Sequence, residues 1–228
     1  MRLLAIDTSS RIGSIALLDG DDVAERFIAT PREQADLVLP LIDDVLASRD
    51  VRLEDLDAFV LGRGPGSFTG IRIAASVLQG LAFAAERPVV SVSSLEALAQ
   101  RAWRELGIED ALVCVDARMQ EVYLARYVVR AGRATLVGEE RLVSPSDVAA
   151  PHDPPPSAGG WSAVGDGFGT YRDALAPVLA CASSVVPDLV PSARDLLVGG
   201  SAELAAGRTL APEAALPVYL RDENAWRK

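Results

Sequence analysis

The chain has 228 residues, more than a typical single domain and fewer than two domains of about 150 residues each, so two small lobes are expected. Half of the residues are hydrophobic but only 5% are aromatic, which predicts an α/β core built mainly from Ala, Val, Leu and Ile. The formal net charge of −10 repels phosphate backbones and argues against independent binding to RNA.

Targeting signals and disulfides are not expected. The N-terminus reaches a carboxylate at Asp7, too early for a signal peptide, and no later run approaches the ~18 apolar residues of a membrane span. We therefore expect a cytoplasmic protein with no membrane contact. Cys114 and Cys181 each lie in an apolar, strand-like stretch, which predicts two buried free thiols rather than a disulfide or a metal pair.

The first 28 residues predict an antiparallel meander. Apolar runs at 3–7, 12–18 and 23–28 are separated by turn-forming residues at 8–11 and 19–21. A dinucleotide-binding fold would begin with strand, helix, strand, so this opening disfavours it.

The segment 31–47 has helical periodicity with an unusually wide apolar arc. Leu37 and Leu41 lie outside the main apolar face, and with Val45 they cover more of the helix than one lobe needs to bury. Pro40 removes a backbone hydrogen bond, so we expect a bend or an early turn there. The face expected to be buried consists of Ala35, Val38, Leu39, Ile42, Val45 and Leu46.

A buried strand at 56–61 is followed by a glycine-rich loop at 62–70. Backbone amides at a helix start attract anions, so Gly64 and Gly66 are candidates for phosphate binding. The loop lacks the G-K-[ST] ending of a P-loop, and Ser93 stands where the dinucleotide fingerprint requires an acidic residue. A tight turn from strand to helix is the simpler interpretation.

The helix expected at 71–85 is rich in small side chains, which let a second helix approach closely. Pro88 ends it, and a strand at 89–92 follows. Ser94 is expected to cap the next helix, at 95–106.

The rest of the chain repeats the opening pattern of strand, Asp, turn and strand. A strand at 112–115 ends in Asp116, as the first strand ends in Asp7, and strands at 122–129 and 135–138 follow. We therefore predict two lobes, each with a mixed sheet whose first strands are antiparallel.

The remaining elements are assigned to the second lobe, which gives an N-terminal lobe at 1–106 and a smaller C-terminal lobe at 107–228. They are a proline-rich loop at 151–160, a strand at 161–165, helices at 171–179 and 192–206, a strand at 185–186 and an extended tail at 217–221.

Few residues offer catalytic chemistry. Asp7 and Asp116 each end a strand, where a carboxylate could bind Mg²⁺, activate a water or simply cap the following turn. The single histidine, His152, lies in the proline-rich loop, so an imidazole-rich metal site is excluded and a Ser-His-Asp arrangement could draw only on a loop residue.

Six segments together resemble the TsaB family, also called YeaZ. The most specific is the stretch from Gly64 to Arg72, and the resemblance covers the whole chain. It implies the actin-like ATPase fold of sugar kinases and actin, related to ribonuclease H, with both lobes on one βββαβα plan. The segments are L-L-A-I-D-T-S-S, E-Q-A-D-L-V-L-P-L-I-D-D-V-L, G-R-G-P-G-S-F-T-G-I-R-I-A, D-A-R-M-Q-E-V-Y, G-D-G and P-V-Y-L-R.

The resemblance also implies a role. TsaB is the non-catalytic relative of TsaD, which transfers the threonylcarbamoyl group to the adenosine following the anticodon in tRNAs that read codons beginning with A. TsaD proteins hold a metal with a His-x-x-x-His pair on their first long helix. The comparable segment here, 32–46, contains no histidine, so no Lewis acid would orient the acyl donor.

The resemblance therefore implies a scaffold without catalytic residues, metal or cofactor. Its expected partners are a TsaD-type catalytic subunit, a TsaE-type ATPase reached through the complex, and tRNA only indirectly; alone, the chain is expected to form a homodimer. TsaB proteins pair through the helices that correspond to 33–47 and 71–85. The implied interface residues are Leu37, Val38, Leu41, Val45, Arg72, Ile73, Val77 and Gly80.

One departure bears on nucleotide binding. Active members of the wider fold carry glycine in the first hairpin turn, whereas residues 8–11 here are Thr, Ser, Ser and Arg. Asp7, Gly64 and Gly66 are thus at most vestigial nucleotide-site residues. The alternatives are a sugar-kinase-like ATP phosphotransferase, favoured by tight ATP binding with hydrolysis, and a TsaD-like metal-dependent transferase or hydrolase, favoured by bound metal.

Overall fold

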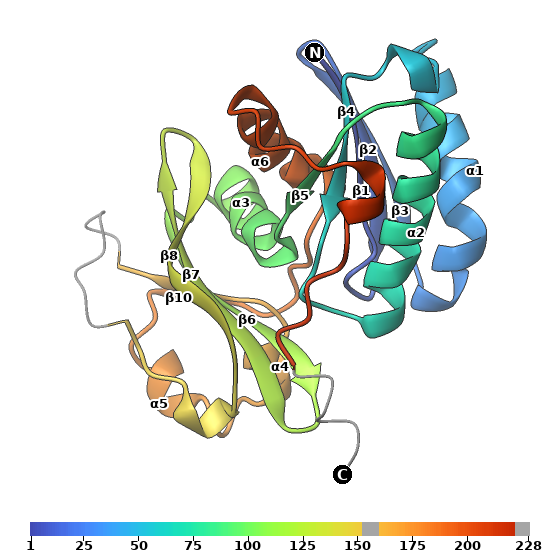
Figure 1. Ribbon diagram of the computed structural model, residues 1–228. Helices are drawn as coiled ribbons and strands as arrows, with labels where there is room; N and C mark the ends of the chain where they lie inside the picture. The colour runs from blue at the N-terminus through green and yellow to red at the C-terminus, as the bar shows by residue number, and fades with distance from the viewer. Residues whose placement is uncertain (152–159, 222–228) are drawn as a thin grey trace. The chain divides into compact units, whose positions relative to one another are not determined.

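The computed structural model describes residues 1–151 and 160–221 (Figure 1), and the chain divides into two compact units. Unit 1 comprises 1–97 and 191–217, and unit 2 comprises 98–190 with the chain from 218 onward. Each unit contains one five-stranded mixed sheet. The division differs from the predicted lobes in two ways: unit 1 ends at Ala97 rather than at residue 106, and residues 191–217 return to it.

The sheet of unit 1 has the strand order β3-β2-β1-β4-β5. β1 pairs antiparallel with β2 and parallel with β4, so the predicted meander is confirmed. The strands are β1 Arg2–Asp7, β2 Gly13–Asp19, β3 Asp22–Ile28, β4 Ala58–Gly62 and β5 Val89–Val92.

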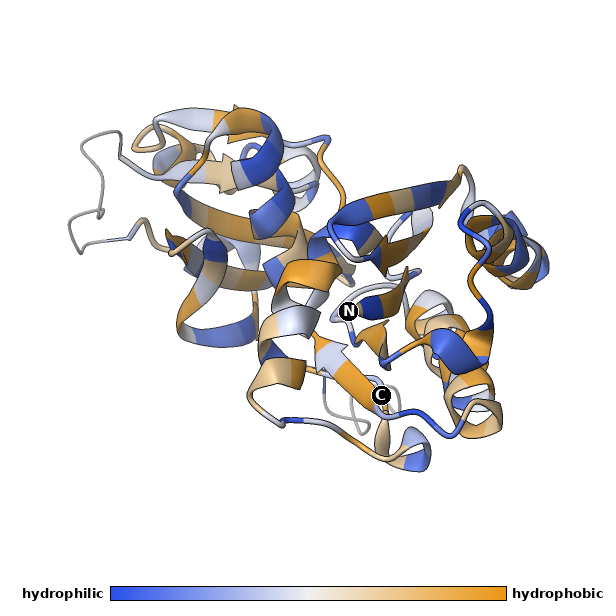
Figure 2. Ribbon diagram, turned by 90° about the horizontal axis from the view of Figure 1, so that it is seen from above, coloured by the Kyte–Doolittle hydropathy of each residue, from blue (hydrophilic) through white to orange (hydrophobic). Residues whose placement is uncertain are grey.

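Both faces of this sheet are covered. Leu4 and Ile6 of β1 bury against one layer, formed by α1 (Gln34–Ala47) and α2 (Phe68–Ala84). Leu3 and Ala5 point the opposite way, toward α6 (Ala193–Ala205) and the start of α3 (Ser94–Leu106). A strand that is buried on both faces has a continuous run of apolar residues in its sequence, as β1 has. Figure 2 shows hydrophobic and hydrophilic residues mixed along the helices, as expected of helices with one buried side.

The placement of α6 corrects the sequence prediction, which assigned this helix to the second lobe. Ala193, Leu196 and Leu197 are buried in the core beneath sheet 1. Gly200 allows the close approach, because a Cβ there would lie 2.6 Å from a methyl carbon of Val60 on β4.

The sheet of unit 2 repeats the order, as β10-β9-β6-β7-β8. β6 pairs antiparallel with β7 and parallel with β9, so the predicted pair of mixed sheets with antiparallel first strands is confirmed. The strands are β6 Asp110–Arg118, β7 Glu121–Arg130, β8 Arg133–Val143, β9 Ser162–Val164 and β10 Ser184–Val186.

The helices of unit 2 depart from the predicted βββαβα plan. Among the described residues between β8 and β9, only the 3-10 turn η3 (Pro145–Asp147) is helical, and His152 lies outside the described residues. Of the helix predicted at 171–179, only α5 (Ala176–Leu179) forms; residues 171–175 are turns, and a short helix, α4 (Gly167–Thr170), precedes them. The break has a local cause: the first turn of α5 holds a proline, which fits there but not in a helix interior.

Two further predictions were wrong in detail. Ala35 and Leu39 are exposed, because the buried stripe of α1 begins at Gln34 and continues through Val38 and Ile42. α1 continues through Pro40, so the helix does not end there, and a bend at this position stays a prediction. Cys114 is buried as expected, and burial raises its pKa, but Cys181 is exposed.

None of the helices within 1–151 and 160–221 has both the length and the hydrophobicity needed to cross a bilayer.

Candidate functional site

Asp7, at the end of β1, is buried with its carboxylate fully engaged by serines. Oδ1 accepts hydrogen bonds from the backbone N–H of Ser9 at 2.9 Å and from its hydroxyl at 2.7 Å. Oδ2 accepts from the Ser94 hydroxyl at 2.7 Å. Of the roles considered for Asp7, capping the turn is therefore the one that its contacts support.

Ser94 has a different role from the predicted helix cap. Its hydroxyl oxygen accepts from the backbone N–H of Gly64 at 3.2 Å while donating to Asp7, so it links the first turn to the glycine loop. The serine that bonds to the first turn of α3 is Ser93, whose Oγ accepts from the N–H of Leu95 at 3.1 Å.

Burial raises the pKa of Asp7, while the hydrogen bonds from Ser9 and Ser94 act in the opposite direction. The pKa of Asp7 is therefore higher in the folded protein than in the unfolded chain. The contribution of this group to stability is fully present at pH values below the unfolded-state pKa. It is lost as the pH rises through the folded-state pKa. Asp7→Asn cannot ionise. We therefore expect the wild type to lose stability relative to Asp7→Asn as pH rises above about 4.

Urea unfolding of both proteins across a pH series would measure this difference. Asp43→Asn, which changes an exposed carboxylate on α1, is the control. Parallel stability curves for wild type and Asp7→Asn would contradict the expectation.

The glycine loop is packed against the first turn. A Cβ on Gly66 would overlap the carbonyl oxygen of Ser9, and one on Gly70 would overlap that of Thr8. Two hydrogen bonds fasten the contact: Ser67 N–H donates to the Ser9 carbonyl at 2.7 Å, and the Thr8 hydroxyl donates to the Gly70 carbonyl at 2.6 Å. The structure thus brings the loop and the first turn together, and these glycines serve close backbone packing.

Asp116 has a similar position in unit 2. Its Oδ1 accepts from the N–H of Arg118 at 2.8 Å and from the hydroxyl of Tyr171 at 2.9 Å, and its Oδ2 forms an ion pair with the Arg118 guanidinium at 2.9 Å. The G-D-G motif packs beneath it, because Cβ atoms on Gly165 and Gly167 would both collide with Cys114. Asp116, like Asp7, caps the turn that follows its strand.

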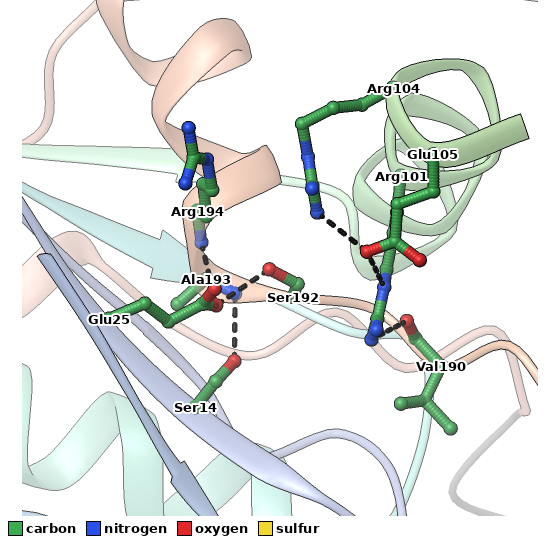
Figure 3. Close-up of polar contacts among 9 residues, drawn as sticks. All are labelled: Ser14, Glu25, Arg101, Arg104, Glu105, Val190, Ser192, Ala193 and Arg194. Carbon is green, nitrogen blue, oxygen red and sulfur yellow. Dashed lines mark hydrogen bonds and ion pairs between the residues drawn. The ribbon is translucent and has the colours of Figure 1, made fainter. Parts of the chain in front are cut away.

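The N-terminus of α6 is capped by side chains from the sheet of unit 1 (Figure 3). Oε1 of Glu25 accepts from the Ser192 hydroxyl at 2.6 Å and from the N–H of Arg194 at 3.2 Å. Ser14 Oγ accepts from the N–H of Ala193 at 2.7 Å. These donors would otherwise attract an anion. Sequence reasoning missed Glu25, because a strand residue far away in the chain carries no local signal for capping α6.

Two of the residues predicted to contact a partner are buried in the core instead. Val38 and Val45 are fully buried in the core of unit 1, so they cannot contact another protein in the folded chain. The exposed positions are Arg72 and Gly80, and a Cβ on Gly80 would meet nothing within 4 Å. The partly buried positions, packed at the edge of the core, are Leu37, Leu41, Ile73 and Val77.

Two aromatic residues of α2 belong to the same surface and were missed. Phe68 is 46% exposed and Phe83 is 76% exposed, and the Arg72 guanidinium lies 3.5 Å from the centre of the Phe68 ring. Large exposed apolar side chains mark binding surfaces, and the sequence signal would have been the place of both aromatic residues outside the buried stripe of α2. We call the whole set the α1–α2 face: Leu37, Leu41, Phe68, Arg72, Ile73, Val77, Gly80 and Phe83.

The family model described as TsaD, tRNA N6-adenosine threonylcarbamoyltransferase, matches residues 29–228. The TsaB protein of Escherichia coli, named for tRNA threonylcarbamoyladenosine biosynthesis, is 39% identical across 100% of this chain and 98% of its own length. The Haemophilus influenzae TsaB is 34% identical across 100% and 97%. The solved structure of YeaZ from Pseudomonas aeruginosa is 41% identical, with a TM-score of 0.88 and coverage of 96% and 99%. The chain therefore belongs to the TsaB family of tRNA threonylcarbamoyladenosine biosynthesis proteins, within the wider family that the TsaD model describes.

Proposed function

We propose that this chain is a non-catalytic subunit that binds a TsaD-type transferase through the α1–α2 face and thereby supports threonylcarbamoyl modification of tRNA. The observation that carries the proposal is the exposed side of α2, where Gly80 leaves room for a partner helix and Phe68 and Phe83 remain uncovered. Small residues permit close helix contact, and exposed aromatics supply apolar area for binding.

The polar contacts in unit 1 support the non-catalytic part of the proposal. The carboxylate of Asp7 is engaged by Ser9 and Ser94, and the glycine loop packs on backbone from the first turn. Segment 32–46 has no histidine with which to hold a metal. The net charge of −10 favours contact with tRNA only through partners, and a TsaE-type ATPase would join through the TsaD-type subunit.

The α1–α2 face would also explain a homodimer of the isolated chain. A two-fold dimer uses the same surface on both copies, so one face can serve either a second copy or the catalytic partner, but not both. We expect addition of the TsaD-type subunit to convert homodimer into heterodimer.

Co-expression with the TsaD-type protein of the same genome tests the proposal. A tagged chain should retain that protein, and purified chain alone should turn over ATP far below about 1 per second. Failure to bind any TsaD-type protein would refute the scaffold role. ATP hydrolysis that Asp7→Asn abolishes would favour the kinase-like alternative, and stoichiometric bound metal would favour a TsaD-like enzyme.

A further inference from the structure

The turn between β6 and β7 has a backbone that its sequence does not explain. Arg118, Met119 and Gln120 have φ angles of 62°, 56° and 61°. L-residues other than glycine adopt this left-handed region only occasionally, and then as single residues. Because Arg118 pairs with Glu121, Met119 and Gln120 are the central residues of a two-residue hairpin turn, a geometry that has positive φ at both positions and favours Asn-Gly or Gly-Gly. Met and Gln lack that preference, and Arg118 adds a third left-handed residue next to a register shift, so contacts from elsewhere would help to hold the turn. We call these three residues the hairpin tip.

The hairpin tip is also open to solvent, unlike the equivalent turn in unit 1. The Arg118 side chain is 85% exposed and Met119 is 58% exposed. In unit 1 the turn after β1 is buried under the glycine loop, with Thr8 fully covered and Ser9 5% exposed. The packing that fixes the first turn therefore does not account for the second.

Arg221, from the C-terminal segment, supplies the contacts. Its Nη2 donates to the carbonyl of Ala117 at 3.1 Å and to that of Arg118 at 3.3 Å, and it pairs with the Glu121 carboxylate at 2.7 Å. Its Nη1 lies 3.0 Å from the sulfur of Met119. The Arg221 side chain is only 9% exposed, and its contact with the Glu121 carboxylate is charge-assisted.

No other side chain that contacts the tip in the described residues can replace this arginine. Asp116 accepts from the N–H of Arg118, and Tyr171 donates its hydroxyl to the same Asp116 oxygen. A carboxylate accepts hydrogen bonds and cannot satisfy carbonyl groups. A planar guanidinium with several donors can bind two carbonyls and a carboxylate at once, which a lysine ammonium does less well.

We propose that Arg221 is a conformational latch that holds the hairpin tip in its left-handed shape. The C-terminal segment thus determines how Arg118 and Met119 are presented to solvent. Without the guanidinium, the carbonyls of Ala117 and Arg118 lose the Arg221 donor, and the left-handed backbone of the tip is free to relax.

Limited trypsin digestion of the full chain tests the latch, because the Arg118–Met119 bond is a trypsin site inside the tip. Arg221→Ala should be cut there about tenfold faster than wild type, the factor produced by losing about 1.4 kcal/mol of local stability. Mass spectrometry of the fragments 1–118 and 119–228 identifies the cut. Amide hydrogen exchange at residues 118–120 should accelerate in parallel.

Two control variants distinguish a local effect on the hairpin tip from a general loss of stability. Arg208→Ala removes another arginine of the C-terminal segment, ion-paired with Glu203, and should leave the cut at Arg118 unchanged. Arg221→Lys should give an intermediate rate. Thermal unfolding of each variant shows whether the fold persists, and if Arg221→Ala unfolds, Glu121→Gln should show a smaller acceleration at the same bond.

A folded Arg221→Ala that is cut and exchanges at wild-type rates in the tip would overturn the proposal. So would a faster cut at all accessible arginines alike, or an equal effect of Arg208→Ala. Under those results the tip would be held by its own sequence and by Asp116.

Discussion

Gly80→Arg is expected to leave the protein folded and to weaken its binding to a TsaD-type partner by at least about 100-fold, or ~2.7 kcal/mol. Gly80 is exposed on α2, and a Cβ added there meets no atom within 4 Å, so a larger side chain can begin without a clash. In a helix–helix contact, the same side chain would be buried as an unpaired charge, which costs several kcal/mol. Removing a helical glycine should not lower stability.

Titration calorimetry with the purified partner would measure the loss, and circular dichroism melting would check the fold. Ala205→Arg, an exposed position at the end of α6, is the matched control and should bind normally. Leu41→Glu is a weaker test, because Leu41 also packs on the core of unit 1. An unchanged Kd for Gly80→Arg, with normal modified adenosine in tRNA, would place the interface elsewhere.

Gly70→Ala and Gly80→Ala should change stability in opposite directions, although both positions lie in α2. At Gly70 the new methyl group overlaps the carbonyl oxygen of Thr8, a backbone atom that cannot move without disrupting the first turn. We expect a loss of roughly 3 kcal/mol or more. At Gly80 the methyl group meets nothing, and the better helix propensity of alanine should add up to about 1 kcal/mol.

Urea denaturation of the two variants and the wild type would measure both effects. Similar stability for Gly70→Ala and wild type would mean that the loop and turn separate readily, and the packing explanation of the glycine motif would then fail.

The strands and the doubled topology could be predicted from sequence, because both depend on local signals. The apolar runs ending in Asp7 and Asp116, each followed by a turn and another strand, are visible without any knowledge of tertiary structure. The helix in 193–205 was equally visible as a helix, but its periodicity does not say which sheet it covers. That depends on Gly200 fitting against Val60, a contact between residues far apart in the chain.

The candidate sites show the same limit. The excess apolar surface of the first helix was visible in Leu37 and Leu41, yet Val38 and Val45, which were predicted to be buried, were also assigned to the interface and belong only to the core. Helical periodicity gives the angular spread of apolar residues, and only the packing of neighbours decides which of them are covered. The contact between Arg221 and the hairpin tip could not be predicted from sequence, because two of its bonds go to backbone carbonyls and its ion pair with Glu121 joins residues far apart in the chain.

The return of 191–217 to unit 1 has a consequence for how the chain is made. Leu3, Ala5 and Val60 emerge from the ribosome early, but α6, which covers them, is complete only at residue 205. One face of the first sheet therefore stays uncovered while unit 2 is synthesised, and an exposed apolar sheet invites association with other chains. Chaperone binding to nascent chains that end before residue 190 should be strongest at this face, and a fragment of 1–106 made alone would keep the exposed surface permanently.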